Sequence, residues 1–348
     1  MIWPDCLTVL TTDACTAECS HCCMNSGLKR RATINVDKTI AFIRDVHSRR
    51  PLGCVVFAGG EPTLLKNDLL RLIRACDEVG ISTRLVTNAS WAIDERRAER
   101  WVARLREAGL REINFSADDY HLPFVPFENI VRAWKAIKGQ GFTSASVVLC
   151  SGEKSLVTPD FVDAQLGETL PRRFDDAGIG AALPDPSEDG TLYLMSNSTV
   201  QLLARARRRL SRDEQSFTGD LGPALGPCRF SMRSAAITPK NHLATCCGFE
   251  VQGNEVLDLG PIDSESDAEA KLRKAGDDVL VTALSRFGPH FLREVARKLA
   301  PEITFDESCR SMCEICEDTV TRPEVVQVLR RHADAIAATI LRMDEECM

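Results

Sequence analysis

The sequence predicts an α/β fold built on a parallel sheet, and two observations support this prediction. Over the first ~210 residues, short apolar runs alternate with segments of helical apolar spacing, which gives about six strand–helix units. Strand-like runs such as residues 54–58 are apolar at every position, which suits strands covered on both faces. Alternation of this kind forms either an open sheet or a barrel, with the helices outside.

The helical segments carry apolar residues three and four positions apart, and several end at a glycine, a residue that often terminates helices. In chain order, the predicted strands are residues 7–11, 54–58, 83–87, 113–116, 146–150 and 179–183. The predicted helices are residues 40–46, 69–79, 98–105, 130–137, 159–165 and 200–210. In a barrel of this kind, the chemistry takes place in the loops that follow the carboxyl ends of the strands.

The character of the sequence changes after residue 210. Residues 211–227 are rich in glycine, proline and charge and are predicted to be a linker, and a second group of cysteines follows. Near the end, residues 324–343 place apolar side chains on one face of a helix. We therefore predict three parts: a barrel over residues 1–212, a cysteine-rich domain over residues 213–320, and a C-terminal helix over residues 321–348.

The composition is that of a folded protein with an acidic balance. The chain has 348 residues, 43 Lys and Arg against 50 Asp and Glu, a net charge of −7 and 44% hydrophobic residues. These proportions exclude wholesale disorder and argue against a general binder of nucleic acids or anionic membranes. No apolar run approaches the ~18 residues that span a bilayer. The first residues have no basic region typical of a signal peptide, so we expect a cytoplasmic protein.

The cysteine count is unusual, because 15 is odd and the expected compartment is reducing. Three of these cysteines, Cys15, Cys19 and Cys22, have the spacing C-x3-C-x2-C directly after the first predicted strand. Three thiolates close together suit an iron–sulfur cluster. Since a cubane cluster normally has four protein ligands, three would leave one iron open to another molecule. Structural zinc, which needs a fourth ligand, and unrelated thiols are the alternatives.

The motif of Cys15, Cys19 and Cys22 resembles the signature of the radical SAM superfamily, and His21 fits the position before the third cysteine, which is often aromatic there. The resemblance implies a 4Fe–4S cluster whose open iron is chelated by the amino and carboxylate groups of S-adenosylmethionine. Reductive cleavage of this molecule would give a 5′-deoxyadenosyl radical, which takes a hydrogen atom from the substrate. Cys23 is interpreted as a non-ligand.

Further motifs strengthen the resemblance, which covers residues 5 to about 210 and implies a partial (β/α)6 TIM-like barrel. Residues 59–62 are similar to the GGEP motif at the end of the second strand, where backbone carbonyls and Glu61 would receive the methionine ammonium. Glycines there allow a close approach of the backbone. Ordinary turns and helix caps are the alternative for these polar residues. The implied cofactor-binding residues are Gly59, Gly60, Glu61, Pro62, Thr87, Asn88, Ser116 and Asp118.

The second group of cysteines supplies a closed set of four ligands. Its proposed members are Cys228, Cys246, Cys313 and Cys316, with Cys309 as a possible substitute. The group is similar to the twitch domain, a shortened SPASM domain that holds one auxiliary 4Fe–4S cluster in some radical SAM enzymes. The resemblance thus implies two 4Fe–4S clusters in all, and structural zinc is the alternative for this group.

Three further residues are candidates for a catalytic role. Asp118, in the fourth strand–helix loop, is a polar substrate contact, a proton acceptor or part of a solvated loop. Cys150 ends the fifth strand as a buried core thiol or a thiol facing substrate. Cys247 is a ligand, a core thiol or a hydrogen donor. The basic run at residues 205–209 is either a solvated helix face or a docking site for an acidic peptide.

The resemblance implies a radical SAM oxidoreductase or maturase that oxidatively modifies a ribosomally made peptide, by crosslinking or dehydrogenation. The alternative is a dehydrogenase or epimerase of a small molecule, such as an aminocyclitol or sugar, or of a peptide residue. A non-enzymatic alternative is an iron–sulfur or zinc-binding module. We expect an electron donor of the flavodoxin or ferredoxin type and no nucleic-acid or membrane partner; the oligomeric state is left open.

Overall fold

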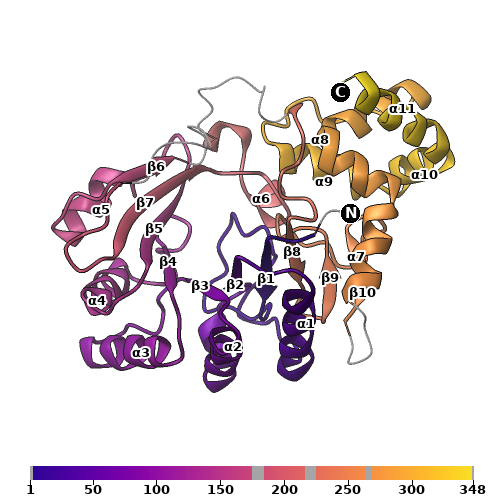
Figure 1. Cartoon of the computed structure of the whole chain (residues 1–348). Helices are drawn as coiled ribbons and strands as arrows, with labels where there is room; N and C mark the ends of the chain where they lie inside the picture. Colours follow the sequence, from indigo (N-terminus) through magenta and orange to yellow (C-terminus); the bar gives the residue numbers. More distant parts are fainter. Residues whose placement is uncertain (1–2, 175–183, 216–224, 263–267, 347–348) are drawn as a thin grey trace.

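The computed structural model describes residues 3–174, 184–215, 225–262 and 268–346. Within these residues one ten-stranded sheet has the order β10-β9-β8-β1-β2-β3-β4-β5-β7-β6 (Figure 1). Strands β1 to β8 pair in parallel, whereas β9 and β10 are antiparallel to their neighbours. The strands are β1 (Cys6–Leu10), β2 (Cys54–Ala58), β3 (Ser82–Thr87), β4 (Glu112–Ser116), β5 (Ser144–Ser151), β6 (Arg172–Phe174), β7 (Leu192–Thr199), β8 (Ser234–Ile237), β9 (His242–Ala244) and β10 (Asp258–Pro261).

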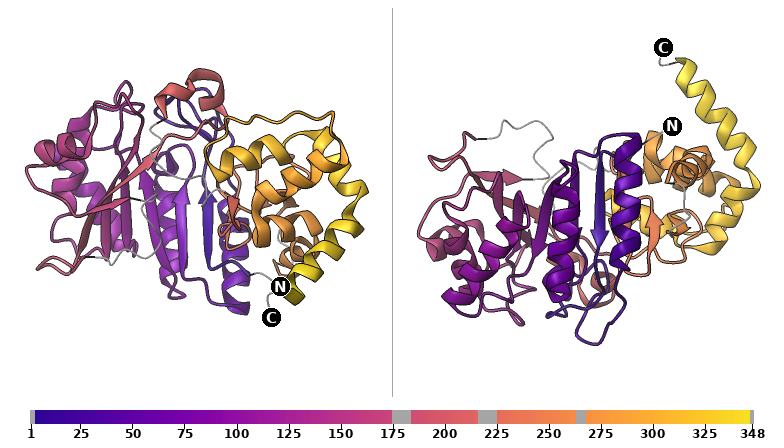
Figure 2. Two further views of the ribbon diagram at one scale, coloured as in Figure 1. Left: turned by 90° about the horizontal axis from the view of Figure 1, so that it is seen from above. Right: turned by 60° about the horizontal axis from the view of Figure 1, so that its bottom comes forward.

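One helix follows each of the first five strands, which is the repeated strand–helix unit that the sequence predicts. These helices are α1 (Val36–Arg49), α2 (Asn67–Asp77), α3 (Glu95–Glu107), α4 (Phe127–Ile137) and α5 (Pro159–Leu166). Later helices are α6 (Arg205–Arg209), α7 (Ala268–Asp277), α8 (Val279–Leu299), α9 (Met312–Val320), α10 (Pro323–Arg331) and α11 (Ala333–Glu346). Helices α9, α10 and α11 each pack on α8, and the group lies beyond the β8–β10 end of the sheet (Figures 1 and 2). None of the described helices combines the length and apolar character needed to cross a bilayer.

Local chemistry explains where the outer helices begin. Asn35, Asp94 and Thr158 precede α1, α3 and α5, and the side chain of each accepts a hydrogen bond from a backbone N–H of the first turn. Such caps satisfy donors that the helix itself leaves unpaired. They fix the helix starts just after the loops in which the candidate site lies.

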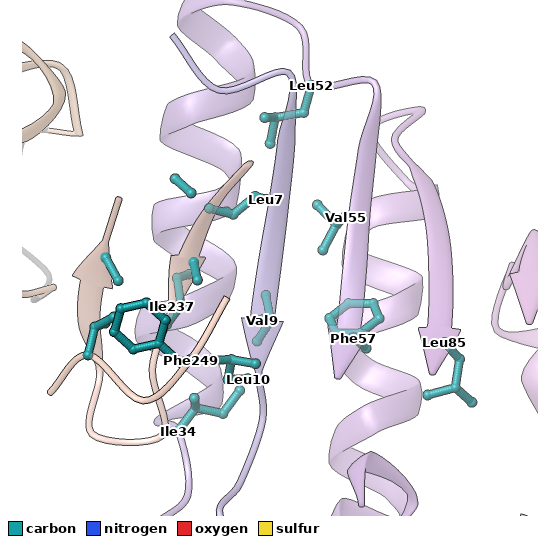
Figure 3. Packing of buried hydrophobic residues seen from close by; sticks show 14 of the residues in the cluster. Leu7, Val9, Leu10, Ile34, Leu52, Val55, Phe57, Leu85, Ile237 and Phe249 are labelled. Atoms are coloured by element: carbon teal, nitrogen blue, oxygen red, sulfur yellow. The ribbon is translucent and has the colours of Figure 1, made fainter. Parts of the chain in front are cut away.

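The two faces of the sheet differ in burial. In β2 and β4, fully buried residues alternate with half-buried ones. Figure 3 shows buried side chains along β1 to β3, including Leu7, Val9, Val55, Phe57 and Leu85. The intervening residues form a face that is only partly covered, as expected of an open barrel whose interior receives a ligand.

The fold class predicted from the sequence is confirmed, with differences in individual elements. The first five strands match the predictions within two residues at each end. The predicted strand at residues 179–183 lies outside the described residues, and β7 is the strand that pairs with β5. The predicted helix at residues 200–210 is reduced to α6, because Ala204 has a positive φ of 47° and cannot continue a helix. The predicted C-terminal helix is divided at His332 into α10 and α11.

The part of the chain after residue 212 extends the same sheet. Strand β8 pairs in parallel with β1, with Cys6 opposite Ser234 and Val9 opposite Ile237. The predicted boundary at residue 212 therefore does not separate two sheets, and the division into domains stays a prediction from sequence.

A break in α8 gives room to the segment that carries Cys228. Gly288 has φ 81° and ψ 174° inside the helix, and a Cβ atom there would lie 2.0 Å from the carbonyl oxygen of Gly226. The backbone N–H of Cys228 donates to the carbonyl oxygen of Leu284 at 3.1 Å. The glycine thus permits the close approach that places Cys228 against the helix.

We expect Gly288→Ala to lower the free energy of unfolding by about 2 kcal/mol or more, because the added methyl group overlaps backbone and requires a strained φ. Urea denaturation of the metal-free protein measures this change. Gly276→Ala in α7 is the matched control, since nothing lies within 4 Å of the position where its Cβ would be. Equal midpoints for the two variants would contradict the role assigned to Gly288.

Candidate active site

The loop between β1 and α1 carries the first cysteine group at the carboxyl end of β1, as the sequence predicts. Hydrogen bonds across the loop define its shape: Thr12 Oγ1 donates to Ala32 O at 2.8 Å, and Gly27 N donates to Asp13 O at 3.1 Å. The N–H of Cys15 donates to Gly27 O at 3.2 Å. The cysteines therefore lie in a closed loop whose two ends are joined.

The surroundings of Cys15 suit a metal-bound thiolate. The backbone N–H of Ala17 and the Nδ2 of Asn88 lie 3.4 and 3.7 Å from its sulfur as donors. Burial, with the nearby charges of Glu61, Cys19 and Cys22, raises the pKa of the Cys15 thiol to about 12. A bound metal reverses such a shift, because it stabilises the thiolate directly. Hydrogen bonds to sulfur are also a normal feature of iron–sulfur sites.

Ligand atoms of His21, Asp118 and His121 all lie within 4.8 Å of one another. Among the described residues, the thiols of Cys15, Cys19 and Cys22 do not form such a group. Their assignment to a cubane therefore rests on the sequence motif.

Gly59 and Gly60 are required by the contact between the ends of β2 and β1. Gly60 N donates to Thr12 O at 2.7 Å, and Glu61 N donates to Ala14 O at 2.9 Å. A Cβ atom on Gly60 would lie 1.9 Å from Ala14 O, and one on Gly59 2.7 Å from Thr12 O. The close approach expected of these glycines is thus made, within the described residues, to the cysteine loop.

The side chain of Glu61 is held by residues of the chain itself. It is fully buried, and its carboxylate accepts hydrogen bonds from Thr63 N, Thr63 Oγ1, Thr87 Oγ1 and Asn88 N at 3.1, 2.6, 2.8 and 2.9 Å. Burial raises the pKa of this carboxyl above its usual value, and these hydrogen bonds oppose the shift. Three of these donors bond to Oε1 and one bonds to Oε2, so the chain's own donors fill most of the carboxylate. The role of Glu61 in receiving an ammonium stays a prediction from sequence.

Glu61 positions Asn88. With its N–H held by Glu61, Asn88 donates from Nδ2 to Thr16 Oγ1 at 3.0 Å, and the same atom faces the sulfur of Cys15. Pro62 begins a short 3₁₀ helix (Pro62–Leu65), and this turn lets the backbone N–H of Thr63 donate to the Glu61 carboxylate. Of the residues that the resemblance implies, Asn88 is the one placed directly against a cysteine of the first group.

Asp118 lies beside the first cysteine group and is almost fully buried. Its Oδ1 accepts from His121 Nδ1 at 2.8 Å and from the backbone N–H groups of Tyr120 and His121. Its Oδ2 lies 3.6 Å from His21 Nε2, and the His21 ring stacks on Tyr120 with centroids 4.6 Å apart. The expected location of Asp118 near the site is therefore correct, but it contacts histidines of the chain itself.

His121 belongs to the polar run at residues 118–121, but the sequence did not predict its contact with the first cysteine group. This histidine hydrogen-bonds both Asp118 and the Cys19 thiol. Burial opposes its charged form, but attraction to Asp118 and these hydrogen bonds hold the pKa of His121 well above its usual value. Burial lowers the pKa of His21 to about 4 despite Asp118. The signal in the sequence was the run of polar residues 118–121 in a strand–helix loop.

Ser116 and Cys150 lie at the carboxyl ends of neighbouring strands. Ser116 ends β4 and pairs with Val148 of β5, two residues before Cys150. Cys150 is half-buried and packs, together with Tyr120, on a small apolar cluster formed by Val200, Leu202 and Ala206. The thiol thus lies on the side of the sheet that faces the Asp118 loop.

A pocket opens beside Gly59, and its lining includes Asp13, Ser26 and Lys240. The Oδ1 of Asp13 and the Oγ of Ser26 are buried and have no hydrogen-bond partner among the described residues. Buried polar atoms without partners are costly, so they indicate a bound water or polar ligand.

The second cysteine group comes together from separate elements. Cys313 and Cys316 lie one turn apart in α9, and a Cβ atom on Gly248 would lie 3.4 Å from the sulfur of Cys313 and 4.0 Å from that of Cys246. Burial raises the pKa of Cys316 well above its usual value, and the charges of Cys246, Cys313 and Cys228 add to the shift. The four thiols expected to form a ligand set are therefore neighbours.

Two other cysteines take different places. Cys309 is buried against Ile315 and Met312 in a separate cluster, so the geometry gives no support to its substitution for one of the four. Cys247 hydrogen-bonds the Thr8 side chain of β1, and burial raises its pKa. The roles left open for Cys247 stay predictions from sequence.

Comparison with known proteins bears on the N-terminal part of the chain. Residues 9–156, less than half of the chain, match the model of the Radical SAM superfamily. The match supports, for this segment, the superfamily that the motif predicted.

Relatives of the chain are distant. The chain is 34% identical over 106 residues to the PqqA peptide cyclase of Rhodopseudomonas palustris, a match that covers 30% of this chain and 26% of the cyclase. It is 22% identical over 116 residues to YydG of Bacillus subtilis (strain 168), provisionally named a peptide biosynthesis protein, covering 33% of this chain and 36% of YydG. The chain thus spans about a third or less of these two relatives.

A solved structure, native anSMEcpe with bound AdoMet and Cp18Cys peptide, aligns with a TM-score of 0.48 and 14% identity. The alignment covers 96% of this chain and 99% of that one.

We expect Gly60→Ala to impair both stability and iron binding at the first cysteine group, because its methyl group would displace the loop at Ala14. The free energy of unfolding should fall by about 2 kcal/mol or more. Urea denaturation of the metal-free protein and iron analysis after anaerobic reconstitution measure the two effects. The control is Gly53→Ala before β2, where the new Cβ meets only Asp5 O at 3.4 Å. Similar iron content in both variants would contradict the importance of this contact.

Proposed function

We propose that this protein is a radical SAM enzyme whose first 4Fe–4S cluster is held by Cys15, Cys19 and Cys22. The observation that carries the proposal is the position of these thiols, in a closed loop at the carboxyl end of β1, inside the segment that matches the superfamily. When bound, the cluster and S-adenosylmethionine supply a 5′-deoxyadenosyl radical that takes a hydrogen atom from the substrate.

The chain's own residues would hold and shield this centre. Asn88 and the N–H of Ala17 offer hydrogen bonds to the sulfur of Cys15, and His121 offers one to Cys19. Such donors stabilise thiolates in a buried site and influence the reduction potential. Asp118 fixes the orientation of His121 through its Nδ1. The remaining residues implied in cofactor binding, including Thr87 and Ser116, stay proposals.

We further propose that Cys228, Cys246, Cys313 and Cys316 hold an auxiliary 4Fe–4S cluster in a twitch-like region. Support comes from the proximity of the four thiols and from the burial of Cys246, Cys313 and Cys316, which raises the pKa of each of these three thiols. Four protein ligands complete the coordination of a cubane. This centre would then accept the electron that remains after oxidation of the substrate.

The proposed reaction is the oxidative modification of a ribosomally made peptide, by crosslinking or dehydrogenation. Support comes from the PqqA peptide cyclase and YydG, whose names refer to peptides. The partly covered face of the sheet, to which Cys150 and Asp118 are adjacent, is the proposed place for the substrate. A reduced flavodoxin or ferredoxin is the proposed electron donor, and the cytoplasm is the proposed location.

Anaerobic reconstitution tests the proposed cofactors. We expect about eight irons per chain, corresponding to two 4Fe–4S clusters, and reductive formation of 5′-deoxyadenosine. Cys15→Ala should lose about half of the iron and all cleavage of S-adenosylmethionine, because the first cluster has only three protein ligands. A wild-type protein that binds zinc and does not cleave S-adenosylmethionine would refute the proposal.

Variants of the second group separate the two centres. We expect Cys316→Ala to retain cleavage of S-adenosylmethionine but to lose the auxiliary iron and the modified product. Cys309→Ala is the control, since this buried cysteine packs in another cluster and should leave the iron content unchanged. Iron analysis, 5′-deoxyadenosine assay and mass spectrometry of candidate peptides measure these outcomes. Loss of iron in the control instead would assign Cys309 to the ligand set.

A further inference from the structure

Residues 200–215, which follow β7 and which we name the linking segment, contact both cysteine groups. On the side of the first group, the central residue is Arg205, which is 7% exposed. Its Nη1 donates to Cys19 O at 3.0 Å, and its Nη2 donates to Ser26 O at 2.5 Å. One buried guanidinium therefore holds two separate points of the loop that carries Cys15, Cys19 and Cys22.

Neighbouring contacts reinforce this attachment. Arg208 Nη2 donates to Asn25 Oδ1 at 2.8 Å, and Asn25 Nδ2 donates to Glu250 Oε2 at 2.7 Å. Glu250 N donates to Cys23 O at 3.1 Å. The segment that follows Cys247 thus touches the same end of the first cysteine loop as α6 does.

On the other side, the linking segment is held by Glu314, which lies between Cys313 and Cys316 in α9 and is fully buried. Glu314 Oε1 accepts from Leu202 N and from Gln215 Nε2, both at 2.7 Å. Glu314 Oε2 accepts from Arg212 Nη1 at 2.5 Å. A buried carboxylate with these partners is costly to displace, because its charge would be left unpaired.

Glu317, one residue after Cys316, holds the start of α6. Its Oε1 accepts from Ala204 N at 2.9 Å, and its Oε2 pairs with Arg207 Nε at 2.9 Å. Ala204 directly precedes Arg205, so the helix of the second cysteine group sets the position from which Arg205 reaches the first.

These contacts correct the interpretations of the basic run at residues 205–209. The four arginines of the run contact acceptors of the chain itself: Arg205 on Cys19 and Ser26, Arg207 on Glu317, Arg208 on Asn25, and Arg209 on Glu18. The run is therefore neither a purely solvated face nor, in this arrangement, a free site for an acidic peptide.

We propose that the linking segment couples the two cysteine groups, with Arg205 as the positioning residue for the first loop and Glu314 as the residue that anchors the segment to the second group. Ligand binding at Cys313 and Cys316 rigidifies α9, and the linking segment transmits this order to residues 15–27. The proposal rests on the proposed function in treating the two groups as metal centres.

Hydrogen–deuterium exchange of residues 15–27 tests the position of Arg205 in the metal-free protein. We expect Arg205→Ala to raise the exchange rate of this loop about tenfold, because two backbone carbonyls lose their buried donor. Arg209→Ala is the matched control, since Arg209 lies on the same helix, is half-exposed and pairs with Glu18 at only 3.5 Å. Urea denaturation identifies any variant that loses global stability, and Arg205→Lys then replaces Arg205→Ala, with a smaller rise expected.

A change at Glu314, beside the second cysteine group, tests the coupling to the first group. Glu314→Gln keeps the shape of the side chain and removes its charge, so it should raise exchange at residues 15–27 as well. Combined with Arg205→Ala, it should add less than its separate effect, because both changes break one connection. Anaerobic iron loading should slow exchange of residues 15–27 in Cys15→Ala, where the second group is intact, but not in a Cys15→Ala/Cys316→Ala double variant.

Wild-type exchange at residues 15–27 in both Arg205→Ala and Glu314→Gln would overturn the proposal. Equal exchange of this loop before and after iron loading of Cys15→Ala would overturn the coupling. The experiments on metal-free protein require no cleavage of S-adenosylmethionine, so failure of the proposed activity and failure of the coupling give different results.

Discussion

The buried carboxylate of Glu61 is the interaction on which the candidate site depends. A charge removed from water must be compensated by hydrogen bonds, and here Thr63, Thr87 and Asn88 supply them. These partners come from the ends of two neighbouring strands, so the carboxylate fixes the ends of β2 and β3 relative to each other. Through Asn88 the constraint extends to the sulfur of Cys15, and through the backbone of Gly60 to the loop of β1. The position of the cysteine loop therefore depends on contacts with the carboxyl ends of β1, β2 and β3.

Much of this site was predictable from sequence because its elements are local. The spacing of Cys15, Cys19 and Cys22 and the strand before them lie within about twenty residues, so pattern and place could be read together. The role of Glu61 could not be read in this way, since two of its donors, Thr87 and Asn88, are 26 and 27 residues distant. The same limit explains the shortened helix at α6, whose preceding N–H groups bond to glutamates more than a hundred residues away. Tertiary hydrogen bonds overrode a local helical pattern in that segment.

The second cysteine group shows what spacing alone cannot decide. Cys309, Cys313 and Cys316 repeat the spacing of the first motif, and sequence gave no means to tell which of them turn toward Cys246. The helical geometry of α9 separates them, because Cys313 and Cys316 lie on one face at a distance of three residues while Cys309 precedes the helix. The contact of His121 with Cys19 was not predicted for a related reason. A histidine in a polar loop has no periodic signature, and only the fold brings it to Cys19.

The pairing of β8 with β1 limits where an extended peptide segment can bind to the sheet as an added strand. A half-open barrel would otherwise end at β1, whose free N–H and C=O groups could recruit an extended segment as an added strand. Here the backbone groups of β1 on that side are paired with β8. The two outer strands are poorly suited to pairing with an added strand, because β6 has only three residues and β10 contains a register shift and ends at Pro261. Strand addition at β1 is thereby closed, so among the described strands an extended segment could pair only along the outer edges of β6 and β10.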